Sequence, residues 1–291
     1  MLEAFQPSAT RPTDFDAYWE RVLNDLAAVP AAAVRDPNPL RSTAFSTCYS
    51  LYLTSVGPYR LYAYYNVPHG DGPFPAILHP PGYASVVTQT PFEERRGYVS
   101  LALCARGQRL ADRPFTASYP GVGVVGIEEP DTYIFRGIVA DTMRAIDFLL
   151  GRREVDARGI ILTGGDTALI GAALRPEVSA VLATDPFFYA ARDLAPRTDA
   201  YPQEEWNEYA RTYPDRAAAM WTALSYFDPL FFAPRITADV RLSVGPGGSL
   251  FSRATAEPLV RASAGRVDVD ERTGYGYLDY KRAITWRNAH T

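Results

Sequence analysis

Short apolar runs that are typical of buried strands alternate with helical segments through most of this chain. The runs predicted as strands lie at 74–83, 98–108, the first half of 159–174, 180–188, 239–248 and 266–277. The segments with helical periodicity lie at 13–28, 131–151, 202–235 and from about 278 onwards. Strands that are apolar throughout must be covered on both faces. The order therefore predicts an α/β fold, with a mostly parallel sheet between two layers of helices.

The domain organisation is simple, because the chain shows no repeat, linker or low-complexity tract, and we interpret residues 1–291 as one domain. The part before the alternation, residues 1–67, adds the first helix and two strands within 44–67, with a Gly-Pro turn between them. The segment at about 201–235 is rich in aromatic residues, and we expect it to form a helical insertion near the pocket.

Histidine, cysteine and lysine are scarce in this sequence. There are three histidines (His69, His79 and His290), two cysteines and a single lysine, Lys281. Two cysteines cannot build a Cys-rich zinc site or a disulfide framework. One lysine near the C-terminus argues against a P-loop or a Schiff-base enzyme. We therefore expect no metal and no cofactor, and any mechanism that needs histidine has very few candidates.

Charge and hydropathy bear on partners and location. Twenty-nine basic and 33 acidic residues give a net charge of −4, and the basic residues are scattered, which argues against nucleic-acid binding. The N-terminus has no basic and apolar leader, and no run approaches the ~18 apolar residues of a membrane span. We expect a cytoplasmic protein that does not enter membranes.

The strand–turn–helix at 159–174 is the most informative segment for function. A sharp turn of the G-x-S-x-G type places a nucleophile above the sheet in α/β-hydrolases, and its flanking residues must be small. Here the frame reads Gly164-Gly165-Asp166-Thr167-Ala168, so the turn is sterically possible with Asp166 at its apex. The alternative is an ordinary turn with Asp166 as the cap of a helix.

Further motifs along the chain resemble those of one family, the acetyl xylan esterase / cephalosporin C deacetylase family of α/β-hydrolases. The matching segments are, in order, 12–19 (PTDFDAYW), 106–108 (RGQ), 133–136 (YIFR), 141–145 (DTMRA), 186–187 (PF) and 224–228 (LSYFD). The resemblance covers nearly the whole chain. It implies an α/β-hydrolase fold and favours the elbow interpretation of the turn. Because family members commonly form hexamers, it also implies a homo-oligomer.

The same resemblance reveals departures at all three catalytic positions. The serine of the family elbow is replaced by Asp166, and Gly248 and Tyr277 stand where the family has its catalytic Asp and His. No histidine lies between residues 80 and 289, so a small shift of the alignment cannot restore it. A Ser-His-Asp esterase needs a hydroxyl, an imidazole and a carboxylate. We therefore do not expect this chain to be one.

Three functions are compatible with an Asp at the apex. We favour non-hydrolytic acid/base chemistry by Asp166, with Tyr277 as partner, in a cyclisation, isomerisation, elimination or lyase step on a hydrophobic small molecule of specialised metabolism. The first alternative is an inactive ligand-binding protein. The second is a hydrolase with Asp166 as nucleophile, of the epoxide hydrolase or dehalogenase type.

The loop after the strand at 74–83 carries further candidates. The resemblance implies that the backbone N–H of Tyr83 serves an oxyanion hole, and the N–H of Thr167 follows the apex residue. His79 precedes two prolines, and we consider it either as a base or as an anchor of this loop.

Three more residues are candidates for substrate binding. Arg106 belongs to the Arg-Gly-Gln motif, and we leave open whether it supports the architecture or contacts the substrate. Phe187 and Phe188 follow the carboxyl end of a strand, where ligands bind in open α/β sheets, so they are candidates for the pocket wall.

Overall fold

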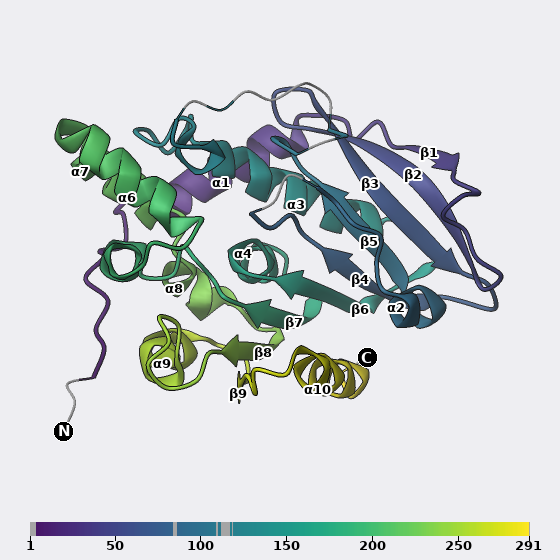
Figure 1. Cartoon of the computed structure of the whole chain (residues 1–291). Coiled ribbons are helices and arrows are strands. Elements are labelled where there is room, and N and C mark those ends of the chain that lie inside the picture. The colour runs from purple at the N-terminus through teal and green to yellow at the C-terminus, as the bar shows by residue number, and fades with distance from the viewer. Residues whose placement is uncertain (1–3, 84–85, 109, 112–116, 118, 291) are drawn as a thin grey trace.

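A nine-stranded sheet forms the centre of the protein in the computed structural model, which describes all residues except 1–3, 84–85, 109, 112–116, 118 and 291 (Figure 1). The strands are β1 (Val34–Pro37), β2 (Ser46–Ser55), β3 (Tyr59–Pro68), β4 (Phe74–His79), β5 (Val99–Cys104), β6 (Val155–Gly164), β7 (Val178–Thr184), β8 (Asp239–Val244) and β9 (Val267–Glu271). Their order is β1-β2-β3-β5-β4-β6-β7-β8-β9. The pairs from β1 to β5 are antiparallel, and those from β5 to β9 are parallel. The predicted α/β class with a mostly parallel sheet is confirmed.

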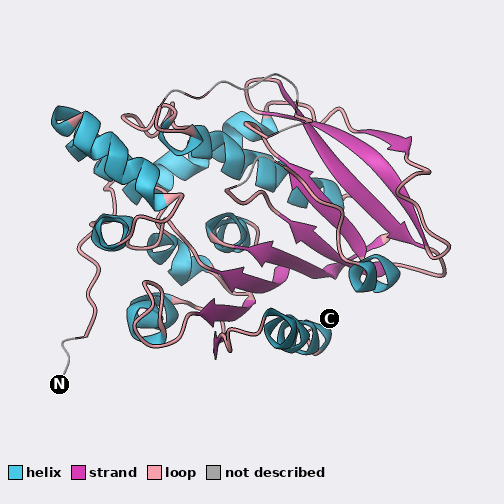
Figure 2. Ribbon diagram, in the orientation of Figure 1, coloured by secondary structure: helices cyan, strands magenta, loops and turns pink. Residues whose placement is uncertain are grey.

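Helices cover both faces of this sheet (Figure 2). They are α1 (Phe15–Ala27), α2 (Phe92–Gly97), α3 (Ile134–Leu150), α4 (Asp166–Leu174), α5 (Ala191–Leu194), α6 (Gln203–Thr212), α7 (Ala217–Ser225), α8 (Pro229–Phe232), α9 (Arg253–Ala262) and α10 (Gly276–Asn288). In Figure 1, α2 and α10 lie on one face, while α1, α3 and α4 lie on the other. Short 3₁₀ turns lie at Val122–Val124, Ala195–Arg197, Pro214–Arg216 and Ala233–Arg235.

The core follows the apolar patterns that mark the helices in the sequence. The apolar stripe of α1 is buried, and its members are Phe15, Tyr18, Trp19, Val22 and Leu26. Burying such side chains stabilises the fold by roughly 1.5–3 kcal/mol each. On the opposite face of the sheet, Ile77 and Ile161 pack with Trp286 of α10. Because side chains alternate along a strand, His79 and Thr163, two residues further on, project to the same face as Ile77 and Ile161.

Several elements differ from the sequence-based prediction. Helix α2 was not expected, because its six residues, FEERRG, are too short and too charged to show an apolar period. Helix α9 and the edge strand β1 were also missed. The strand predicted at 266–277 ends at Glu271, and α10 already begins at Gly276. The segment at 202–235 is divided among three helices and two 3₁₀ turns.

Candidate active site

The turn between β6 and α4 has the geometry of a tight elbow. Gly164 adopts a φ of 149°, a value that side-chain-bearing residues rarely reach. A Cβ atom on Gly165 would lie 3.1 Å from the carbonyl oxygen of Thr184 at the end of β7. Asp166 is the first residue of α4, as the apex position requires. Small residues are therefore needed here because backbone packs directly against backbone.

The carboxylate of Asp166 is enclosed by the protein. The backbone N–H of Phe187 donates to Oδ2 at 2.8 Å, and the N–H of Phe188 donates to Oδ1 at 3.0 Å. The residue is only 1% exposed. Burial raises the pKa of Asp166 to about 8, although the two N–H donors partly oppose that shift. Asp166 thus ties the start of α4 to the loop after β7.

Tyr277 does not meet Asp166. It lies in the first turn of α10, is 69% exposed, and has the Lys281 ammonium 5.5 Å from its ring centre. Helix α10 lies on the face of the sheet opposite α4 (Figure 1). The predicted Asp166–Tyr277 pair is therefore wrong, because the chain turns after β9 and places this helix on the other face.

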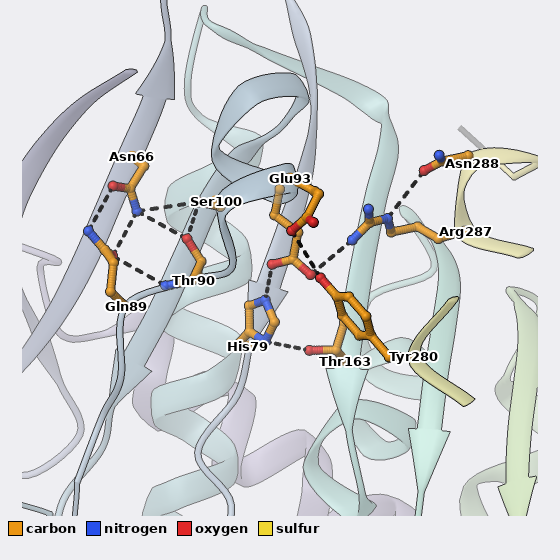
Figure 3. Close-up of polar contacts among 11 residues, drawn as sticks. Asn66, His79, Gln89, Thr90, Glu93, Ser100, Thr163, Tyr280, Arg287 and Asn288 are labelled. Atoms are coloured by element: carbon orange, nitrogen blue, oxygen red, sulfur yellow. Dashed lines mark hydrogen bonds and ion pairs between the residues drawn. The ribbon is translucent and has the colours of Figure 1, made fainter. Parts of the chain in front are cut away.

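A different group of side chains meets at the ends of β4 and β6 (Figure 3). The hydroxyl oxygen of Thr163 lies 2.8 Å from Nδ1 of His79, and Nε2 of His79 lies 2.6 Å from Oε2 of Glu94 in α2. With hydrogen on Nε2, the imidazole donates to Glu94 and accepts from the Thr163 hydroxyl. We call Thr163, His79 and Glu94 the T-H-E array. It has the order of groups, hydroxyl–imidazole–carboxylate, that nucleophilic acyl transfer requires.

The two ends of the T-H-E array differ in exposure. The Glu94 side chain is 5% exposed, that of His79 is 29% exposed, and Thr163 is half-buried. The carboxylate therefore lies in the interior, and the residue that carries the hydroxyl is only partly buried.

A cavity of about 320 Å³ lies beside His79 and is lined mainly by residues of the 80–91 loop together with Ala102 and Leu103 of β5. Two of its lining residues, Gln89 and Thr90, are hydrogen-bonded to Asn66 of β3, and Thr90 also pairs with Ser100 of β5 at 2.7 Å (Figure 3). These bonds hold the loop against the sheet next to the imidazole.

The model of the acetyl xylan esterase family matches residues 1–250. The chain belongs to the acetyl xylan esterase family. The acetyl esterase Axe7A from Xylanibacter ruminicola is 26% identical in an alignment 264 residues long, which covers 84% of this chain and 58% of that protein. This chain therefore spans less than two thirds of that relative.

Solved structures agree on the fold of this family member. The acetyl xylan esterase from Paenibacillus sp. R4 superposes with a TM-score of 0.88, at 24% identity, over 99% of this chain and 98% of that one. Acetyl xylan esterase 1 from Thermoanaerobacterium sp. JW/SL YS485 superposes with a TM-score of 0.82, also at 24% identity, over 96% of this chain and 94% of that one. The predicted α/β-hydrolase fold is thereby confirmed.

The function predicted from the sequence is corrected by these comparisons. The family and the relatives just named are acetyl esterases, so the findings point to a hydrolase. They contradict the favoured cyclase, isomerase or lyase, and they give no indication of an inactive binding protein. The Asp-nucleophile hydrolase of the epoxide hydrolase or dehalogenase type was part of the same prediction and is likewise not supported. Those predictions relied on Asp166, whose environment the sequence does not reveal.

Each of the predicted oxyanion residues makes a side-chain hydrogen bond in this esterase-family chain. The Thr167 hydroxyl donates to the carbonyl oxygen of Pro81 at 3.3 Å, which joins α4 to the loop after β4. The Tyr83 hydroxyl donates to Glu205, a buried residue of α6 whose other carboxylate oxygen accepts from the N–H of Gly123. These hydrogen bonds connect the loop after β4 to α4 and to α6.

The predicted substrate-binding residues have structural partners. The Arg106 guanidinium makes two hydrogen bonds, of 2.9 and 2.8 Å, to the fully buried Asp141 of α3. Phe188 is buried between the rings of Phe135 and Trp206, at centroid distances of 4.7 and 5.3 Å. Phe187 packs beside it and is less deeply buried.

The structure also reveals residues that the sequence analysis missed. Thr163 and Glu94 lie 84 and 15 positions from His79, and Glu94 belongs to a helix with no sequence signal. Only the position of His79 at the end of a predicted strand pointed to this place. Within the described part of the chain, no three His, Cys, Asp or Glu side chains gather so that they could hold a metal ion. None of the helices described is long and apolar enough to span a membrane.

Proposed function

We propose that this chain hydrolyses acyl esters, acetyl esters first of all, and that Thr163 is its nucleophile in place of a serine. The observation that carries the proposal is the unbroken hydrogen-bonded series from the Thr163 hydroxyl through His79 to Glu94. Membership of a family of acetyl xylan esterases supports the reaction type.

The elbow does not supply the nucleophile in this proposal. Asp166 has no hydroxyl group, and both of its oxygens accept hydrogen bonds from backbone N–H groups. Thr163 is three positions earlier and retains the functional group that ester hydrolysis uses. Its β-branched side chain has few rotamers, so the bond to His79 holds the hydroxyl in one orientation.

The reaction proceeds in two acyl transfers. Thr163 Oγ1 attacks the ester carbonyl carbon while its proton passes to Nδ1 of His79, and Glu94 stabilises the resulting imidazolium. The alcohol leaves with that proton, and an acyl-threonine remains. A water molecule then attacks the acyl carbon and gives a proton to His79. The carboxylic acid is released as the Thr163 hydroxyl recovers that proton.

The test is hydrolysis of p-nitrophenyl acetate by the wild type and by the Thr163→Val variant, which keeps the side-chain shape and loses the hydroxyl. We expect kcat to fall by at least about 100-fold. The matched control is Thr184→Val, at the exposed end of the neighbouring strand β7, which should keep the wild-type rate.

The outcomes separate the two parts of the proposal. If the wild type releases no p-nitrophenol and no acetate from acetylated xylan, the esterase function is wrong. If the wild type is active and Thr163→Val is equally active, the function stands and Thr163 is not the nucleophile.

A further inference from the structure

Arg287 lies in the last turn of α10 and reaches the interior end of the T-H-E array. Its Nη1 atom lies 2.9 Å from Oε1 of Glu94, and the two side chains are 4% and 5% exposed (Figure 3). The guanidinium also lies over the ring of Tyr98, at 4.7 Å from its centre. Helix α10 lies beyond residue 250, where the match to the family model ends.

We propose that Arg287 is a positioning residue for His79, an inference that rests on the esterase function proposed above. Glu94 has two carboxylate oxygens and one partner for each, since Oε1 accepts from Arg287 and Oε2 lies against His79. With Oε1 engaged by the guanidinium, the carboxylate plane is set and Oε2 faces the imidazole. The position of Oε2 then fixes the orientation of the His79 ring. The ring orientation in turn fixes the hydrogen bond from the Thr163 hydroxyl to Nδ1.

Burial makes this contact necessary. A carboxylate that is removed from water needs an opposite charge or several hydrogen-bond donors, or it takes up a proton. Without Arg287, the imidazole is the one hydrogen-bond partner that the Glu94 carboxylate keeps among the described residues. The carboxylate then turns toward water or becomes protonated, and in either case it no longer orients His79 or balances an imidazolium.

Other ionisable groups near this end of the array come from α2 and α10. Glu93 of α2 accepts a hydrogen bond from the Tyr280 hydroxyl of α10 at 3.2 Å. Arg287 itself also approaches the uncharged side-chain amide of Asn288. Among these groups Arg287 is the one that contacts the Glu94 carboxylate directly, so its removal changes the charge next to His79 most.

The first experiment measures kcat and KM for p-nitrophenyl acetate in three variants. Arg287→Met should lower kcat by about 10- to 100-fold with little change in KM, the effect that supporting hydrogen-bond partners commonly have. Arg287→Lys keeps the charge and should recover part of kcat. The control is Arg282→Met on the same helix, which loses an ion pair with Asp270 and leaves Glu94 untouched. Wild-type kcat in Arg287→Met would overturn the inference.

The second experiment does not depend on hydrolysis. With only three histidines in the chain, the imidazole of His79 can be assigned by NMR. Because Glu94 no longer fixes the ring, the ¹H and ¹⁵N chemical shifts of the His79 imidazole should change in Arg287→Met and stay as in the wild type in Arg282→Met. A purely structural role would lower the melting temperature of both variants without changing these chemical shifts. Unchanged His79 chemical shifts in Arg287→Met overturn the inference even if the wild type proves not to be an esterase.

If Arg287→Met does not fold, the Arg287→Lys variant tests the positioning role. An ammonium group cannot reproduce the planar fork of a guanidinium, so we expect a partial loss of kcat and a smaller change in the His79 chemical shifts in the folded protein. A folded Arg287→Lys variant with wild-type kcat and unchanged His79 chemical shifts would contradict the positioning role.

Discussion

Thr163 and Asp166 stand three positions apart, the first near the end of β6 and the second at the start of α4, and their surroundings are opposite in kind. Asp166 points into the layer of α4, where backbone N–H groups hold both of its oxygens. Thr163 points to the face covered by α2 and α10, where its hydroxyl meets an imidazole and the residue is only half-buried. The contrast teaches that a residue at the expected apex is not thereby reactive. Partners and access decide whether a side chain can do chemistry.

The comparison is tested most strongly by His79→Gln. Glutamine can keep a polar contact but cannot act as a general base, so ester hydrolysis should fall by about 1000-fold. Asp166→Asn, assayed alongside, should keep most of the activity of the folded protein. If Asp166→Asn instead loses most of its activity and His79→Gln keeps it, the reaction takes place at the elbow and the comparison fails.

Asp166→Ala should affect stability instead of chemistry. The buried N–H groups of Phe187 and Phe188 would lose their acceptors, and we expect the free energy of unfolding to fall by about 2–4 kcal/mol. Urea denaturation measures this loss, and the rate per folded molecule should stay near wild type. A variant as stable as the wild type would show that these hydrogen bonds do not hold the elbow.

The pKa of Asp166 predicts a dependence of stability on pH. This pKa is about 8 in the folded state and near 3.8 in an exposed carboxyl, so between these values the folded state holds a proton that the unfolded chain has released. The contribution of Asp166 to stability therefore falls as pH rises from about 4 to 8, and it changes no further above that. Asp166→Asn has no titrating carboxyl at this position and therefore lacks this pH-dependent contribution to stability.

The measurement is urea denaturation of the wild type and Asp166→Asn at pH 5, 6.5 and 8. The wild type should lose stability relative to the variant as pH rises. Asp228, a second buried carboxyl whose pKa burial raises to about 7, is present in both proteins, and its charge adds to the rise in the pKa of Asp166. A difference that stays constant with pH would show that Asp166 is ionised throughout this range.

The smallest effect is expected for Tyr277→Ala. The ring is exposed on α10 and lies on the face opposite Asp166, so the free energy of unfolding should change by less than about 0.5 kcal/mol. A loss of several kcal/mol in chemical denaturation would indicate that Tyr277 is packed against other side chains after all.

Much of the fold could be predicted from local patterns. The apolar stripe of α1 and the tight turn at Gly164 depend on neighbours in the sequence, and side-chain period and backbone sterics are local properties. Helix α2 escaped prediction because its six residues, four of them charged, carry no apolar period. This omission mattered, since α2 holds Glu94. The predicted homo-oligomer, hydrophobic substrate and cytoplasmic location stay predictions.

The sequence by itself determined the family, the α/β architecture and the absence of serine from the elbow, because these depend on residue order and type. Only the tertiary structure decided which polar groups meet. His79, Glu94, Thr163 and Arg287 come from two strands and two helices, and Glu94 and Arg287 lie 193 positions apart. Burial and hydrogen bonding act between neighbours in space, and the packing of α2 and α10 on one face of the sheet makes these residues neighbours.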